Sequence, residues 1–477
     1  MSDAPTTRLK PVEVRVRLDY DSALRKVMGL ADFERSTHSP GHSAFHIERM
    51  SLLMERLGNC HLDIPTVHVA GTKGKGSTAA MVTSILTAEG YTVGLYTSPH
   101  LHSAVERIRV GLTPVSKGDF ASLVERVWPD VEWVGEKGAL GAVTTFEMLT
   151  AMAFLHFKQI GADFQVIEVG LGGRLDSTNI VTPSVCIITS ISLDHVATLG
   201  GTLERIAREK AGIIKPGAPV VVAPQPDEAM AVFREVAAEK RSPLISVADD
   251  MSWEKGQANL DRQTFAIEGA HGRYELATRL LGDIQIENAS TAVAAIESLV
   301  GSGFAVSDES VVRGVRDVSW PARLEILTGG PPLVVVDGAH NPYSMKRLVE
   351  SVRQYFDFDR VFVVFGALGG HSGRGMLAEL AALAPTVVPV RSRHPRSAPS
   401  ALMAAVASDL GLSVEGEAAS VAHGTRRAIE LAGDGDLVLG TGSLSVAAEV
   451  IEEIRGIEPE LYPYIKRPAD SGTMSAV

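Results

Sequence analysis

Residues 66–78 read TVHVAGTKGKGST, and this stretch decides the fold of the first half of the chain. A short β-branched run leads into a glycine-rich turn that carries Lys75, and a helix-like segment follows from Ser77. A glycine loop between a strand and a helix N-terminus binds phosphate, because unpaired backbone N–H groups and the helix dipole both point at the anion. We therefore predict a nucleotide site in which Lys75 contacts the β- and γ-phosphates and the hydroxyl of Ser77 or Thr78 faces Mg²⁺. The predicted phosphate-binding residues are Gly71, Thr72, Gly74, Lys75, Gly76, Ser77 and Thr78.

The spacing of this loop differs from that of the common P-loop, G-x-x-x-x-G-K-[ST]. Val69 stands where the pattern has its first glycine, and Gly76 stands where it has Ser or Thr. Two interpretations follow: a glycine-rich turn with an isolated lysine, or a nucleotide site of a variant kind. We favour the variant nucleotide site.

The composition is that of a globular protein with two or three domains. The chain has 477 residues, of which 45% are hydrophobic and 21% are charged. No apolar run approaches the ~18 residues that span a bilayer, and no secretory signal is recognisable, so we expect no membrane partner. Cys60 and Cys186 lie in apolar sequence, which predicts reduced thiols and a cytoplasmic protein. The formal charge of −12 argues against a nucleic-acid partner, although residues 391–396, RSRHPR, form a local basic patch for an anionic substrate.

Strand-like and helix-like segments alternate along the chain in two series. The first has strand-like runs at 67–70, 93–96, 165–169, 185–190 and 220–223, with helical segments such as 145–159 and 203–213. The second has strand-like runs at 333–336, 361–365, 387–390 and 437–440, with helical segments at 342–355 and 443–454. Such alternation predicts mostly parallel sheets with helices on both faces. Residues 250–282 read instead as hairpins, and Pro321 interrupts the two series, so we predict two α/β domains with a boundary near 318–326.

Polar residues follow several of these strands, at the edge where open α/β sheets bind ligands. Ser98 lies in YTSPHL, a stretch that a plain proline turn also explains. Glu168 lies inside an apolar strand, where a buried carboxylate needs a salt-bridge partner or a metal ion, and we favour the metal. Asp194 and His195 follow another strand; a lone histidine there is more often structural, but Glu168 and the nucleotide loop favour a metal ligand. Lys210 lies at a helix end, where it either complements the dipole or has a function.

The second series carries DGAHNP at residues 337–342, between a strand and a helix. Capping of the helix explains Asn341 and Pro342 but leaves Asp337 and His340 without a structural reason. Residues 440–443, GTGS, have the same layout and predict either a second anion site or a capped helix start.

Ten short motifs extend the argument to nearly the whole chain, from about Ile47 to Ile454. They are HVAGTKGKGST, YTSPHL, FEMLTAMAF, IEVGLGGRLDSTN, SLDH, EKAGIIKPG, IENAS, WPARLE, DGAHNP and TGSL. In this order they resemble the folylpolyglutamate synthase and dihydrofolate synthase family of the Mur ligase superfamily. The resemblance implies an N-terminal P-loop-type ATPase domain with a mostly parallel sheet and a smaller C-terminal Rossmann-like α/β domain. We predict an ATP- and folate-binding domain at 1–318, a hinge at 319–326 and a glutamate ligase domain at 327–477.

The resemblance also implies ATP-dependent amide ligation. The carboxylate of a reduced folate or of dihydropteroate would accept the γ-phosphoryl group of ATP, and the amine of L-glutamate would attack the acyl phosphate. Carboxylates are poor electrophiles, so this activation explains the nucleotide site, and catalysis consists of positioning and charge neutralisation. The catalytic residues implied by the motifs are Lys75, His195, Lys210, Arg323, Asp337 and His340. The implied ligands of one or two Mg²⁺ ions are Ser77, Ser98, Glu168 and His195, while Asn288, Arg323 and Asp337 would bind the nucleotide.

Lys210 matches a lysine that is carbamylated in this superfamily, which would turn a cation into an acceptor near the metal. Two departures from the family pattern stand out. Lys73 occupies a position where the family usually has Asn, and an extra cation there is compatible with ATP. Residues 369–375 read GGHSGRG where the family tends to carry an acidic–Lys–acidic cluster, so no contacts are inferred for that loop.

Two alternative functions are less consistent with the sequence. A cell-wall ligase acting on a UDP-linked sugar would carry a uridine-binding domain before the phosphate loop, but only about 70 residues precede Gly71. A non-catalytic nucleotide switch would not need Glu168, His195, Asp337 and His340 together. Within the family, members add the first glutamate, extend the chain, or do both; we expect a bifunctional enzyme and a monomer.

Overall fold

The computed structural model describes residues 17–34, 46–136, 140–194 and 196–462. The phosphate-loop strand lies inside a mostly parallel eight-stranded sheet with the order β4-β3-β2-β5-β1-β6-β7-β8. The antiparallel pairs of this sheet lie at one edge, where β3 pairs with both β2 and β4. Because β1 pairs in parallel with β5 and β6, the loops that follow these three strands lie side by side. The strands are β1 (Thr66–Ala70), β2 (Val93–Tyr96), β3 (Ile108–Val110), β4 (Thr113–Pro114), β5 (Phe164–Glu168), β6 (Val185–Ile188), β7 (Val220–Val222) and β8 (Leu244–Ser246).

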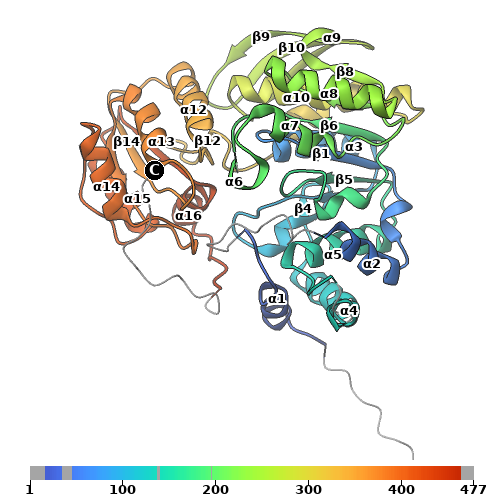
Figure 1. Cartoon of the computed structure of the whole chain (residues 1–477). Coiled ribbons are helices and arrows are strands. Elements are labelled where there is room, and N and C mark those ends of the chain that lie inside the picture. The colour runs from blue at the N-terminus through green and yellow to red at the C-terminus, as the bar shows by residue number, and fades with distance from the viewer. Residues whose placement is uncertain (1–16, 35–45, 137–139, 195, 463–477) are drawn as a thin grey trace, which may run out of the picture.

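Helices cover both faces of this sheet, as Figure 1 shows. One face buries its apolar side chains against α3 (Lys75–Glu89), α10 (Asp283–Gly301) and α11 (Asp308–Asp317). The opposite face packs against α1 (Tyr20–Met28), α2 (Ile47–Arg56), α4 (Lys117–Glu136) and α5 (Thr145–Gln159) at one end, and α7 (Leu203–Ala211) and α8 (Asp227–Lys240) at the other. The short helices α6 (Val196–Leu199) and α9 (Val247–Asp250) lie in connections.

A small antiparallel sheet follows the large one, with the order β11-β10-β9. Its strands are β9 (Ser252–Ala258), β10 (Gln263–Gly269) and β11 (Gly272–Thr278). Phe265 and Ile267 of β10 are buried in the same core as α10, so this sheet extends the N-terminal domain.

The C-terminal part forms a separate six-stranded sheet with the order β12-β13-β17-β14-β15-β16. The strands are β12 (Glu325–Ile326), β13 (Leu333–Val336), β14 (Val361–Phe365), β15 (Thr386–Pro389), β16 (Ser413–Val414) and β17 (Leu437–Thr441). All pairs are parallel except β12 with β13. One face is covered by α12 (Pro342–Tyr355), α13 (Gly373–Leu380) and α14 (Ser400–Asp409), and the other by α15 (Val421–Leu431) and α16 (Leu444–Arg455).

The predicted two-domain α/β fold is therefore confirmed, with corrections at the ends of elements. The phosphate-loop helix begins at Lys75 rather than at the predicted Ser77. The last two residues of the predicted hinge form β12, which pairs with the C-terminal sheet. Cys60 and Cys186 are free and buried, and among the described residues no helix has the length and apolar composition needed to cross a membrane.

Candidate active site

A cleft of about 1890 Å³ lies between the two domains. Its lining includes the phosphate loop and the loops that follow β2, β5, β6 and β13. It also includes the loop after β14, the turn after β15 and the start of α16. Strand-end loops from the two sheets thus form one cavity. Of the predicted site residues in the described part of the chain, all line it except Thr78, which is fully buried.

The phosphate loop is held against the end of β6. The backbone N–H groups of Thr72 and Lys73 both donate to the carbonyl of Ser190, at 3.0 and 3.1 Å. A Cβ at Gly71 would lie 1.8 Å from Oγ1 of Thr189, so a side chain cannot be placed there without moving β6. Gly74 has φ of +88° and precedes α3 without a side-chain cap, which only glycine does at little cost.

The start of α3 fits a phosphate group. Thr78 donates its N–H to the carbonyl of Gly74, so the preceding N–H groups of this helix have no partner inside the helix. The hydroxyl of Thr78 is buried and has no hydrogen-bond partner among the described residues. Ser77 is also buried, at 1% exposure. Unsatisfied donors at a helix N-terminus match an anionic ligand such as a nucleotide phosphate.

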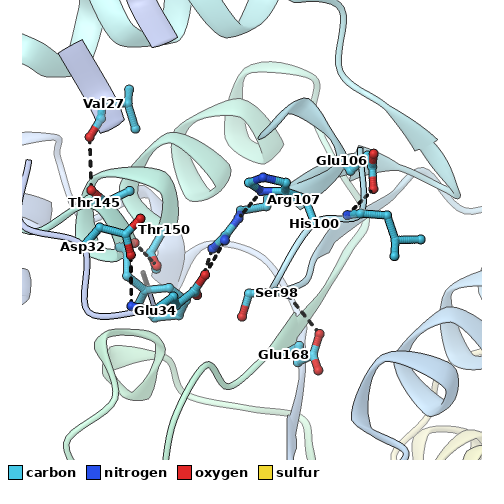
Figure 2. A network of polar contacts seen from close by, with 12 residues as sticks. Val27, Asp32, Glu34, Ser98, His100, Glu106, Arg107, Thr145, Thr150 and Glu168 are labelled. Atoms are coloured by element: carbon cyan, nitrogen blue, oxygen red, sulfur yellow. Dashed lines mark hydrogen bonds and ion pairs between the residues drawn. The ribbon is translucent and has the colours of Figure 1, made fainter. Parts of the chain in front are cut away.

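Glu168 lies at the end of β5 beside this loop. Figure 2 shows its carboxylate next to Ser98, whose backbone N–H donates to Oε2 at 3.1 Å. Nζ of Lys75 lies 3.9 Å from Oε1 of the same carboxylate. Burial raises the pKa of Glu168, while the positive charge of Lys75 opposes that rise.

The carboxylate of Glu168 has the properties of a Mg²⁺ ligand. It is buried with few donors around it, and Mg²⁺ prefers the oxygen atoms that Glu168, Ser98 and Ser77 carry. Among the described residues, no three His, Cys, Asp or Glu side chains form a metal-binding group. His195, the fourth predicted ligand, lies outside the described residues.

Lys210 is buried at the end of α7 and reaches the phosphate loop. Its Nζ donates to the carbonyl of Gly71 at 2.7 Å. Burial, together with the positive charge of Lys75, lowers the pKa of Lys210 to about 7. The sequence left two interpretations of Lys210 open. Its contact with the carbonyl of Gly71 favours a function at the phosphate loop over simple complementation of the helix dipole.

Lys73 joins the two domains. Its Nζ lies 2.7 Å from Oδ2 of Asp194, in the loop after β6, and 2.7 Å from Nε2 of His340, in the loop after β13. Nδ1 of His340 lies 2.8 Å from the carbonyl of Gly338, so Nδ1 carries the proton and Nε2 accepts from Lys73. Burial and the charge of Lys73 lower the pKa of His340, while Asp194, whose Oδ2 lies 3.6 Å from Nε2, opposes this shift. Sequence reasoning identified Lys73 as a departure but did not predict this contact.

We expect the Lys73→Asn variant to open the cleft in the absence of nucleotide, because asparagine is too short to contact Asp194 and His340 together. Small-angle X-ray scattering should show a larger radius of gyration than for the parent chain. The turnover number should fall by less than about tenfold, because the predicted phosphate contact of Lys75 is kept. Lys158→Asn is the matched control, since its pair with Asp63 is exposed and lies within one domain. An unchanged radius of gyration in Lys73→Asn would refute the link.

Arg323 and Asp337 approach the cleft from the start of the C-terminal sheet. Asp337 accepts the N–H groups of Leu324 and Ala339 at 2.9 and 2.8 Å, and burial raises its pKa while Arg323 opposes the rise. Nη1 of Arg323 donates to the carbonyl of Ala322 at 2.8 Å, and no carboxylate of the described residues lies within 4.0 Å of this guanidinium. Asp337 thus shapes the loop, and the Arg323 guanidinium has no carboxylate partner among the described residues, which is compatible with its predicted phosphate contact.

The structure places Asn288 beside the phosphate loop, whereas it makes the GTGS stretch at 440–443 a helix start. Asn288, on α10, lies against the phosphate loop, where a Cβ at Gly74 would come 2.3 Å from its Oδ1. Ser443 accepts the N–H of Val446 and caps α16, which favours the capped helix start over a second anion site. Asn341 likewise caps α12 with Pro342 in its first turn, as predicted.

A partly buried network that the sequence did not predict lies beside Ser98. Figure 2 shows Arg107 between His100 and Glu34; its Nε lies 2.9 Å from Nδ1 of His100, and its two terminal nitrogens contact both carboxylate oxygens of Glu34. Arg107 and Glu34 are separated by 73 positions in the chain, so no local pattern reveals the pair. The network fixes the cleft wall next to the predicted metal ligands.

Comparison with known proteins agrees with this geometry. The Mur ligase middle domain matches residues 69–296, and the Mur ligase glutamate ligase domain matches residues 322–444. The dihydrofolate synthase/folylpolyglutamate synthase of Bacillus subtilis is 41% identical over 342 residues, which cover 71% of this chain and 79% of that protein.

Solved structures show the same fold over nearly the whole chain. The folylpolyglutamate synthase of Mycobacterium tuberculosis complexed with ADP superimposes with a TM-score of 0.85 at 30% identity, covering 93% of this chain and all (100%) of that one. Escherichia coli FolC in complex with DHPP and ADP gives a TM-score of 0.79 at 32% identity, covering 92% and 98%. With its two Mur ligase domains and these relatives, the chain belongs to the dihydrofolate synthase/folylpolyglutamate synthase family of ATP-dependent ligases.

Proposed function

We propose that this enzyme joins L-glutamate both to dihydropteroate and to reduced folates, with ATP as phosphoryl donor. The observation that carries the proposal is the single cleft in which Lys75, Glu168 and Lys210 of one domain lie opposite Arg323 of the hinge and His340 of the other domain. A relative named for both activities is 41% identical, which supports the bifunctional form. A non-catalytic nucleotide switch would leave this set of charged residues from two domains without a role.

In the first step the acceptor carboxylate attacks the γ-phosphorus of ATP, the bond to the ADP oxygen breaks, and an acyl phosphate forms. The phosphate loop binds the transferred group through its backbone N–H groups, and Lys75 neutralises its charge. Arg323 adds positive charge from the hinge, and the loop shaped by Asp337 fixes its approach. In the second step the amine of L-glutamate attacks the acyl carbon, inorganic phosphate leaves, and the amine loses a proton to solvent or to a neutral side chain.

We also propose that Ser77, Ser98 and Glu168, with the predicted ligand His195, hold Mg²⁺. The burial of the Glu168 carboxylate and the oxygen character of the other donors support this assignment. Bound there, Mg²⁺ would offset the negative charge of the phosphates. The adenine contact of Asn288, the monomeric state and the cytoplasmic location stay predictions.

Lys210 is proposed to act as a carbamate. The neutral amine attacks CO₂, a nitrogen–carbon bond forms, and one proton is released. A pKa of about 7 supports the proposal, because much of the amine is then neutral near pH 7. The carbamate carries negative charge, so the repulsion from Lys75 and Lys73 becomes attraction.

The proposal is tested by product analysis with purified protein, ATP, Mg²⁺ and L-glutamate. Dihydropteroate and tetrahydrofolate are supplied separately, and mass spectrometry follows the addition of one glutamyl unit, with Lys75→Ala as the control for contaminating ligase. Products from both acceptors establish the bifunctional enzyme. Product from only one acceptor shows that the enzyme has only the activity toward that acceptor. No product from either acceptor contradicts the proposed function.

A further inference from the structure

Arg396 lies in the turn after β15, and this turn is fixed to the loop after β14. The N–H of Gly369 donates to the carbonyl of Arg396 at 2.7 Å, and the N–H of Ala398 donates to the carbonyl of Ala367 at 2.9 Å. The N–H of Arg396 itself donates to Nδ1 of His394 at 3.1 Å. The backbone that carries this arginine is therefore held at the cleft by hydrogen bonds on both sides.

Among the described residues, the guanidinium of Arg396 contacts only carbonyl groups. Nη2 donates to the carbonyl of Gly369 at 2.7 Å, and Nη1 lies 3.4 Å from the carbonyl of Glu34 in the other domain. Gly370 leaves room for it, since a Cβ there would come 3.3 Å from Nη2. No carboxylate of the described residues lies within 4.0 Å of this guanidinium, and burial alone lowers the pKa of Arg396.

Neighbouring arginines on the cleft wall differ in this respect. Arg393, three positions earlier, forms ion pairs with Glu449 and Glu452. Arg107 holds both carboxylate oxygens of Glu34, so that carboxylate already has a guanidinium partner. A half-buried cation that contacts only neutral carbonyls has lost hydration without gaining an opposite charge. Arg396 is thus arranged to receive an anion from the cleft.

The position of Arg396 places that anion close to the reaction. The loop that accepts its hydrogen bond continues to His371, whose ring lies 5.4 Å from the ring of His340, centre to centre. His340 contacts Lys73 of the phosphate loop. One short loop therefore separates the guanidinium from the phosphate-binding residues.

We propose that Arg396 binds a carboxylate of a glutamate unit, either the incoming L-glutamate or the glutamyl residue of the folate acceptor. The inference rests on the proposed function, since it takes its ligand from that reaction. A planar guanidinium matches a carboxylate with two parallel hydrogen bonds, which fixes both position and orientation. The nucleotide phosphates already have Lys75 and Arg323, so the second anionic partner of the reaction is the one left for Arg396.

The test compares Arg396→Gln and Arg396→Lys with the parent enzyme. For Arg396→Gln we expect the KM for L-glutamate to rise about 10- to 100-fold, the range for one charge-assisted contact, with the KM for ATP and kcat within threefold. Arg396→Lys should recover part of the loss, because it keeps the charge without the two-pronged geometry. Arg427→Gln is the matched control, since it makes the same charge change on the outer surface of the same domain.

The acceptor distinguishes the two sources of the carboxylate. If the glutamyl residue of folate is the ligand, Arg396→Gln raises the KM for tetrahydrofolate and leaves the KM for dihydropteroate, which has no glutamyl unit, unchanged. An unchanged KM for L-glutamate and for tetrahydrofolate overturns the proposal, as does an equal loss in every kinetic constant, which indicates a purely structural role. Failure of the parent enzyme to form any glutamyl product would instead contradict the proposed function.

Discussion

The Lys75→Ala variant is expected to lose about 10³-fold or more in kcat/KM for glutamate ligation. Lys75 is the first residue of α3 and its Nζ lies 3.9 Å from Glu168, so its charge is placed between the phosphate loop and the predicted metal ligand. The transferred phosphoryl group is predicted to lie here, and its negative charge needs a cation, which alanine does not supply. Steady-state ADP release that requires both L-glutamate and the acceptor provides the measurement.

Lys75→Arg separates charge from shape in this experiment. Arginine keeps the charge but is bulkier, so we expect an intermediate loss of activity. Thermal unfolding should stay close to that of the parent enzyme in both variants, since the Lys75 side chain is not part of a hydrophobic core. Activity of Lys75→Ala within tenfold of the parent would show that the loop does not bind the reacting phosphates.

Replacement of Lys210 by alanine is expected to lower kcat by about 10²-fold or more, because a carbamate would position the charges at the reacting phosphates. The parent enzyme incubated with ¹³CO₂ should show a protein-bound carbamate signal in its ¹³C NMR spectrum, and this signal should be missing in Lys210→Ala. The folded-state pKa of about 7 lies well below the usual 10.5, so the reactive neutral amine accumulates as pH rises through 7. At fixed CO₂ concentration the signal should therefore weaken as pH falls below 7.

Lys210→Arg tests whether a cation alone is sufficient. Arginine stays protonated and does not form the carbamate, so we expect it to be as impaired as alanine. Full activity in Lys210→Arg, or a parent enzyme without the ¹³C signal, would exclude the carbamate.

Local patterns predicted most of the central strands and helices. The helix at 145–159 has the predicted bounds, because Thr144 and Glu147 form a capping box at its start. The phosphate-loop helix begins two residues earlier than predicted, since the backbone of Gly74 replaces the side-chain cap that sequence reasoning looks for. The edge strands β4, β12 and β16 have two residues each, too few for a recognisable alternation.

The contacts that complete the site could not be predicted in the same way. Lys73 and His340 are 267 positions apart, and Arg396 and Glu34 are 362 positions apart. Their meeting depends on how the two domains face each other, which no periodicity encodes. The motifs predicted which residues carry the chemistry, and the structure shows that Lys73 and Arg396 lie beside the same cleft.

The most direct test of the central claim follows oxygen from the acceptor carboxylate. Tetrahydrofolate labelled with ¹⁸O in the carboxylate that is extended is converted with ATP, Mg²⁺ and L-glutamate, and the phosphate released is analysed by mass spectrometry. Ligation through an acyl phosphate transfers one ¹⁸O to the phosphate released when the first glutamate is added. Glutamyl product accompanied by unlabelled phosphate would contradict activation of the carboxylate by ATP.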